Sequence, residues 1–197
     1  MVAQVRRLSG IRKVGHAGTL DPEAEGLLIV LVGKEYTKQS DKFLKQDKTY
    51  EFDLKLGETS TTGDEEGEKT AVSNNSLASE PSKKAISDVL EGLQGTIEQT
   101  PPIYSAIKVD GQRAYKLAAK GQTPDLKPRQ ITIHSIELLS YDYPTVSIRA
   151  DVSSGTYIRS LGETIGEQLG CGAYCTSIVR TRIGDYKLED AISLPAT

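Results

Sequence analysis

One stretch of the sequence, residues 15–26, holds the side chains best suited to chemistry. It reads Gly-His-Ala-Gly-Thr-Leu-Asp-Pro-Glu-Ala-Glu-Gly and contains one of the two histidines of the chain. Glycine adopts backbone angles closed to other residues, and Pro22 keeps Asp21 out of the helical region. A polar loop that leads directly into an apolar run, here 27–32, is typical of a scaffold that presents a working side chain. Asp21 is therefore a candidate catalytic carboxylate, although Asp-Pro is also ordinary turn chemistry.

A second candidate is Arg159, which stands where a helix is expected to begin. The alternating segment 145–152 leads into a Ser/Gly/Thr turn, and apolar residues then recur at helical spacing from Ile158 to Leu169. The first turn of a helix favours anions, so an arginine there indicates a fixed partner such as a buried carboxylate. Such a pair keeps an aspartate ionised and oriented, which suits nucleophilic or electrostatic chemistry at a sugar carbon. The sequence shows no second carboxylate of the kind that a glycosidase requires.

Composition and charge narrow the class of protein. The 197 residues are 37% hydrophobic and 26% charged, and they contain no apolar run near the roughly 20 residues of a membrane span. No signal-peptide pattern opens the chain, so a cytoplasmic protein is expected. Cys171 and Cys175 fit neither a zinc spacing nor a disulfide framework.

The net charge of -3 hides a strong segregation of charge. Residues 51–100 carry four Lys/Arg against eleven Asp/Glu, and much of this acid surrounds Asp64 in a Gly/Ser/Thr-rich run. We assign that run, within 57–76, to a solvated loop. The rest of the chain can then present a positive face, which permits a polyanionic partner without requiring one.

Hydrophobic periodicity predicts a mixed α/β domain. Tyr50 starts the apolar face of a half-buried strand with a period of two. The expected helices are an amphipathic one within 2–13, then 37–46, one capped near Ser82 and ending at Gly95, 114–120 and 158–169. The expected strands are 27–32, 48–56, 130–139, 145–152 and 177–186, the last with Arg180 and Arg182 exposed.

Several blocks of the sequence resemble the tRNA pseudouridine-55 synthase (TruB) family, which has relatives in guide-RNA pseudouridylation particles. The block from Lys13 to Pro22, Lys-Val-Gly-His-Ala-Gly-Thr-Leu-Asp-Pro, is similar to the signature of that family. The resemblance continues in family order over nearly the whole chain, at 33–38, 48–50, 101–108, 154–161, 170–173 and 180–184.

The resemblance implies a fold and a domain organisation. The expected fold is α+β, with a mixed, largely antiparallel sheet of the pseudouridine synthase type flanked by helices. One catalytic domain over 1–197 is expected, with a helical, thumb-like insertion at about 77–127 that closes on RNA. By the same resemblance, we expect the chain to lack the Lys-Pro-rich segment that usually opens the family and the C-terminal RNA-binding module of many relatives.

The resemblance also implies an activity. It predicts an isomerase without cofactor or metal, which breaks the bond between uracil N1 and ribose C1′, turns the base over and rejoins it through C5. The implied substrate is a uridine of tRNA, expected at position 55 in the T-stem-loop, and the protein is expected to be a cytoplasmic monomer that binds no membrane. The target uridine must leave its stack to reach the catalytic aspartate.

Residue by residue, the resemblance assigns the following roles. Asp21 matches the essential aspartate, and Arg159 matches the arginine that pairs with it. Tyr50 matches a tyrosine that stacks on the base and is a candidate acceptor of the C5 proton. The expected substrate-binding residues are His16, which fills the space of the flipped base, Ile178, which lines the pocket, and Tyr157, Lys38, Arg180 and Arg182.

Two other functions stay open at the level of the sequence. A module that binds or folds tRNA without turnover would keep its affinity when Asp21 is replaced, with a steep salt dependence. A guide-dependent subunit would modify no RNA without partner proteins and a guide.

Overall fold

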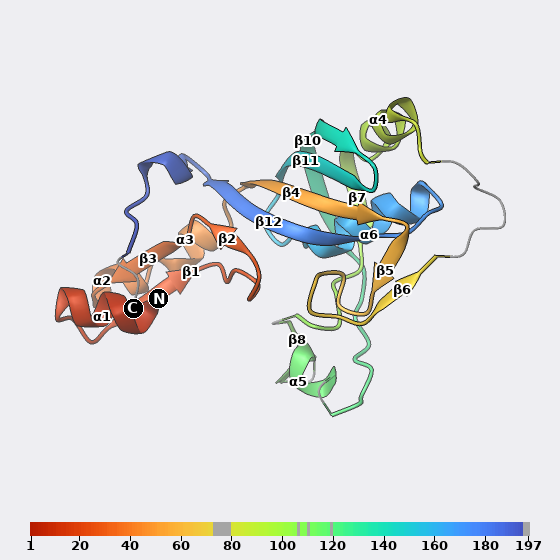
Figure 1. Ribbon diagram of the computed structural model, residues 1–197. Helices are drawn as coiled ribbons and strands as arrows, with labels where there is room; N and C mark the ends of the chain where they lie inside the picture. The colour runs from red at the N-terminus through yellow and green to blue at the C-terminus, as the bar shows by residue number, and fades with distance from the viewer. Residues whose placement is uncertain (73–79, 106, 110, 119, 195–197) are drawn as a thin grey trace.

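The computed structural model describes residues 1–72, 80–105, 107–109, 111–118 and 120–194 and is built on one mixed sheet (Figure 1). The strands lie in the order β13-β12-β4-β11-β10-β7, and β2 is added beside β12. All pairings are antiparallel except that of β2 with β12, which is parallel. The predicted α+β fold with a largely antiparallel sheet is confirmed. The strands are β2 (Glu25–Gly26), β4 (Lys48–Leu56), β7 (Gly95–Gln99), β10 (Arg129–Asp142), β11 (Thr145–Val152), β12 (Ala173–Ile183) and β13 (Tyr186–Lys187).

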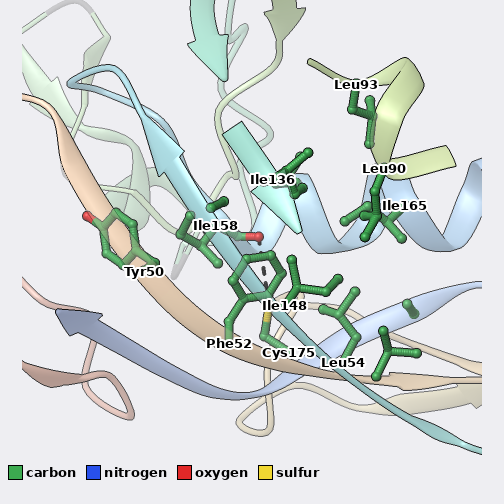
Figure 2. Packing of buried hydrophobic residues seen from close by; sticks show 14 of the residues in the cluster. Tyr50, Phe52, Leu54, Leu90, Leu93, Ile136, Ile148, Ile158, Ile165 and Cys175 are labelled. Carbon is green, nitrogen blue, oxygen red and sulfur yellow. Dashed lines mark hydrogen bonds between the residues drawn. The ribbon is translucent and has the colours of Figure 1, made fainter. Parts of the chain in front are cut away.

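The core lies between this sheet and two helices, α4 (Lys83–Gly92) and α6 (Ile158–Gln168). Strand β4 buries every second residue, as its period of two predicts, and Phe52 and Leu54 face Ile148 and Ile165 in the packed layer (Figure 2). Helix α4 begins at its cap Ser82, whose Oγ accepts a hydrogen bond from the N–H of Ala85 at 3.1 Å. Among the described residues, no helix is long and apolar enough to span a bilayer.

The N-terminal elements gather at one end of β4 and β12 (Figure 1). Strands β1 (Val14–Ala17) and β3 (Ile29–Val32) form a separate two-stranded sheet beside α1 (Val2–Ser9). The expected buried strand at 27–32 is therefore shorter and only half buried, because it has one strand partner and lies outside the main sheet. The helix expected at 37–46 is two short helices, α2 (Lys34–Thr37) and α3 (Ser40–Leu44).

The segment expected as an insertion at about 77–127 has two parts, one that packs with the main sheet and one that lies away from it. Residues 77–79 lie outside the described residues, whereas α4 packs on β10 and β7 forms the edge of the main sheet. The described residues between about 100 and 128 lie away from the sheet, with β8 (Lys108–Val109), β9 (Gln112–Arg113) and α5 (Ala114–Ala118) (Figure 1). The amphipathic pattern after Ser82 marks a core helix, because its apolar stripe packs against the sheet rather than within a separate unit.

The predicted loop 57–76 contains a hairpin of β5 (Glu58–Ser60) and β6 (Lys69–Ala71), and a short 3-10 helix, η1 (Leu188–Asp190), follows β13. Residues 73–76 of that predicted loop lie outside the described residues. The turn between its strands lies against β12 and α6, because the N–H of Cys175 on β12 bonds the carbonyl of Gly63 at 2.9 Å and Arg159 on α6 bonds that of Thr62 at 2.7 Å. This contact brings the acidic run to the functional site.

Candidate active site

Asp21 and Arg159, 138 positions apart in the sequence, meet in an ion pair. The Arg159 Nε donates to Asp21 Oδ2 at 2.8 Å. The arginine side chain is 4% exposed, whereas that of Asp21 is 39% exposed, so the aspartate stands at the surface end of the pair. Arg159 lies in the first turn of α6, as predicted, and its expected fixed carboxylate partner is present.

The other nitrogens of Arg159 are also bound. Its Nη1 donates to the Thr62 carbonyl at 2.7 Å and lies 3.3 Å from Asp64 Oδ2, and its Nη2 donates to the Tyr104 carbonyl at 2.9 Å. The guanidinium is thus held by two carboxylates and two backbone carbonyls from different segments. A buried arginine with this many acceptors has one position, and it fixes the Asp21 oxygen that it binds.

Asp64 is the functional residue that sequence reasoning missed. Its assignment to a solvated loop is wrong, because the residue is 6% exposed and faces Arg159. Gly63, at a φ of +73°, makes the tight turn, and the Asp64 Oδ1 accepts bonds from the Thr62 hydroxyl and from the N–H of Glu66. The Thr-Gly-Asp order is the only local signal, since the partner arginine lies 95 positions later.

Arg180 is buried rather than exposed, which corrects the prediction for this residue. It is 1% exposed, and its Nε donates to the Leu27 carbonyl at 2.8 Å while its Nη2 donates to the Gly18 carbonyl at 3.2 Å. Arg180 lies opposite Tyr50 in the register of β12 and β4, on the face that also buries Ile178. Its guanidinium therefore fixes both ends of the loop that carries Asp21.

Arg182 is half buried, which corrects the expectation that this residue is exposed. All three of its nitrogens are bound within the chain, to Thr49 Oγ1 at 2.9 Å, Asp151 Oδ1 at 2.7 Å and the Gly184 carbonyl at 2.8 Å. The register of β12 shifts between Arg180 and Arg182, which breaks the alternation that the sequence pattern assumes.

A cavity of about 100 Å³ joins most of the other predicted site residues. This volume is far below the roughly 300–1,000 Å³ of sites for drug-sized ligands, so it suits one small planar group. His16, on β1, and Lys38, at the C-terminal end of α2, are both exposed and do not line this cavity. The lining residues are Thr19, Leu20, Asp21, Ala24, Tyr50, Thr156, Tyr157, Ile158, Ile178 and Arg180.

Burial sets the protonation of the tyrosine in this cavity. Tyr50 is 8% exposed, and desolvation raises the pKa of its phenol, while the neighbouring Arg180 guanidinium acts in the opposite direction. The phenol is therefore protonated at neutral pH. It offers a flat ring beside the Asp21 carboxylate, and its hydroxyl can accept a proton only when another group assists.

Glu163, on α6 near Arg159, gives a testable pH dependence. Burial raises the pKa of its carboxyl, with Arg159 acting in the opposite direction. A raised pKa in the folded state means that stability is lost as the pH rises through that pKa. Glu163→Gln should therefore raise the melting temperature by about 2 °C at about pH 8. This gain should shrink as the pH falls through the raised pKa and vanish below the pKa of an unperturbed glutamate, about 4.3. Thermal melting monitored by circular dichroism at high and at low pH measures the two melting temperatures.

Glu167→Gln, at an exposed position of the same helix, is the control. An equal gain for Glu163→Gln at high and at low pH would contradict this pH dependence.

Two solved structures are similar to this chain over most of its length. A Cbf5-Nop10-Gar1 complex matches 94% of this chain and 45% of that chain, with a TM-score of 0.70 and 29% identity. An H/ACA RNP bound to a substrate RNA containing 2'-deoxyuridine matches 94% of this chain and 43% of that chain, with a TM-score of 0.67 and 26% identity.

Several curated relatives have a higher sequence identity to this chain than these structures do. The family model of the TruB family pseudouridylate synthase, N-terminal domain, matches residues 6–158. A tRNA pseudouridine synthase B of Protochlamydia amoebophila is 42% identical over 98% of this chain and 72% of its own length. That of Cupriavidus metallidurans is 45% identical over 98% of this chain and 60% of its own length, and that of Parabacteroides distasonis is 46% identical over 92% and 75%.

The family model and these relatives show that the chain is of the pseudouridine synthase class. Within that class, the chain belongs to the TruB family. It spans 60% to 75% of the length of the three relatives described above.

Proposed function

We propose that this chain isomerises a uridine of tRNA to pseudouridine and that Asp21 is its catalytic carboxylate. The observation that supports this most strongly is the Asp21–Arg159 pair beside a small cavity lined by Tyr50 and Ile178. Asp21 Oδ2 is bound by Arg159, whereas Oδ1 accepts no hydrogen bond from the described residues and is available to a ligand. Family membership supports the reaction class.

The reaction exchanges one bond of the base for another. The bond between N1 and C1′ breaks, the base turns, and a bond forms between C5 and C1′. The hydrogen at C5 leaves as a proton, and N1 gains one, so the product is an isomer of the substrate. An ionised carboxylate next to C1′ can stabilise or capture the positive charge that develops when N1 departs.

The cavity residues have distinct proposed roles. The Tyr50 ring stacks on the uracil. Its phenol first loses its own proton to solvent, with the Arg180 charge stabilising the phenolate, and the phenolate oxygen is then the candidate acceptor of the C5 proton. Ile178 and Tyr157 close the other sides of the cavity. The flipped uridine costs a few kcal/mol of lost stacking, and His16, exposed on the strand before the Asp21 loop, is the candidate that fills the vacated space.

We propose the T-stem-loop of tRNA, with its uridine at position 55, as the substrate. Folded RNA of this kind is recognised by shape and by phosphate contacts, which need exposed basic side chains. Lys38 and Lys42 on the N-terminal elements, and Arg113 and Lys116 on the segment 100–128, meet that requirement. We further propose that the protein acts in the cytoplasm as a monomer.

Release of tritium from a tRNA transcript labelled at uracil C5 tests this function. The wild-type chain is expected to release one tritium per tRNA and to leave a pseudouridine in the T-loop. Binding of the transcript without release would instead favour the non-catalytic RNA-binding module. Release that requires added partner proteins and a guide RNA would favour a guide-dependent subunit.

A further inference from the structure

A buried glutamine, Gln99, holds the backbone at the start of the helix that carries Arg159. Its Nε2 donates to the Tyr157 carbonyl at 3.0 Å, and its Oε1 accepts from the N–H of Tyr157 at 2.8 Å. Gln99 is 6% exposed and does not line the cavity. Its carboxamide thus pairs with both backbone groups of one residue, which fixes the position of that residue.

Tyr157 is the residue from which α6 starts. It is the N-cap of the helix, it makes no side-chain capping bond, and Arg159 follows two positions later. The N–H groups at a helix N-terminus have no partner within the helix, so an outside acceptor must satisfy them. Gln99 provides that acceptor for Tyr157 and sets where the first turn of the helix begins.

The chain that follows Gln99 reaches Arg159 from its other side. The Tyr104 carbonyl accepts the bond from Arg159 Nη2 at 2.9 Å. Between these two contacts, Pro101 and Pro102 restrict the backbone, so the segment cannot easily stretch or fold. One piece of chain therefore binds both the backbone of Tyr157, two residues before Arg159, and the guanidinium of Arg159 itself.

We propose that Gln99 is a positioning residue for the isomerisation. It acts through Tyr157 to hold Arg159, and Arg159 holds the Asp21 carboxylate. This inference rests on the proposed function. It also means that the segment 100–128, which leaves the sheet directly after Gln99, is connected to the catalytic ion pair by two hydrogen-bonded contacts.

Gln99→Glu provides a test in one folded variant. An ionised carboxylate still accepts the N–H of Tyr157, but it has no donor and repels the Tyr157 carbonyl, which already accepts a bond from the N–H of Leu161. A protonated carboxyl regains the donor. Burial raises the pKa of such a group, so the proton should return as the pH is lowered from about 8 toward about 5.

At about pH 8, the kcat of Gln99→Glu is therefore expected to be about 10- to 100-fold below that of the wild type. At low pH, the ratio of the two kcat values is expected to return toward one. The affinity for tRNA, measured by filter binding at constant salt, should change less than about threefold. Glu98→Gln, at the exposed neighbouring position of β7, is the control and should follow the wild type at every pH.

Three results would overturn a positioning role for Gln99. They are a ratio that stays flat across the pH range, a loss that appears in affinity alone, and a loss that follows unfolding in circular dichroism at the same pH. A wild-type chain that forms no pseudouridine would contradict the proposed function itself, so the two failures are distinguishable.

Discussion

Asp21→Asn is expected to lower the rate of tritium release from C5-labelled tRNA by at least about 10⁴-fold, which is the scale of loss for a residue that acts on the reacting atoms. The amide has nearly the shape of the carboxylate and can still face Arg159, but it carries no charge. It can neither capture nor stabilise a positive centre at C1′. Binding of tRNA should persist, because affinity for RNA comes mainly from phosphate contacts outside the cavity.

Asp151→Asn is a matched control for this substitution. Asp151 is also a partly exposed aspartate that pairs with an arginine, with its Oδ1 2.7 Å from Arg182 Nη2, but it lies outside the cavity. Its replacement should leave tritium release within about threefold of the wild type. Equal losses in the two variants would show that the effect of Asp21→Asn comes from structure rather than from chemistry.

Arg159→Lys is expected to lower tritium release by about 10²- to 10³-fold and to destabilise the protein by about 3 kcal/mol. A lysine has a single ammonium group, which cannot reach Asp21, Asp64 and two carbonyls from one position. The two carboxylates would then lie near each other with incomplete compensation, and Asp21 would lose its fixed orientation. Quenched single-turnover assays measure the loss of rate, and chemical denaturation measures the loss of stability.

Arg149→Lys is the control for the change of side chain alone. Arg149 also binds two carboxylates, those of Glu51 and Glu137, but it is exposed and does not line the cavity. We expect its replacement to change stability by less than about 1 kcal/mol and to leave the rate unchanged. Wild-type activity in Arg159→Lys would contradict the role that we give to the buried guanidinium.

The elements with strong periodicity could be predicted from the sequence. Strands 48–56 and 145–152 have the predicted bounds, because each has one buried and one more exposed face along its whole length. Helix α6 could be predicted from its apolar spacing. The anionic partner of Arg159 could be predicted because a positive charge in the first turn of a helix is unfavourable unless an anion lies nearby. Burial of Tyr50 followed from its place at the start of the apolar face of β4.

The parts that escaped prediction depend on contacts between distant segments. The acidic run around Asp64 looks solvated by composition, and only the fold brings its one buried carboxylate to Arg159. Arg180 looks like a surface cation, yet the register of β12 against β4 places it opposite Tyr50 and beneath the loop of Asp21. Strand β3 is less buried than its apolar sequence predicts, because it pairs outside the main sheet.

We propose that the Asp21 carboxylate enables the conversion of one uridine of tRNA into pseudouridine. Nucleoside analysis of a T-stem-loop RNA, incubated with an excess of the wild-type chain or of Asp21→Asn, tests it most directly. We expect one pseudouridine per RNA with the wild type and none with the variant, at equal RNA occupancy in both samples. Pseudouridine formed by Asp21→Asn at the wild-type rate, or none formed by a wild-type chain that binds the RNA, would contradict it.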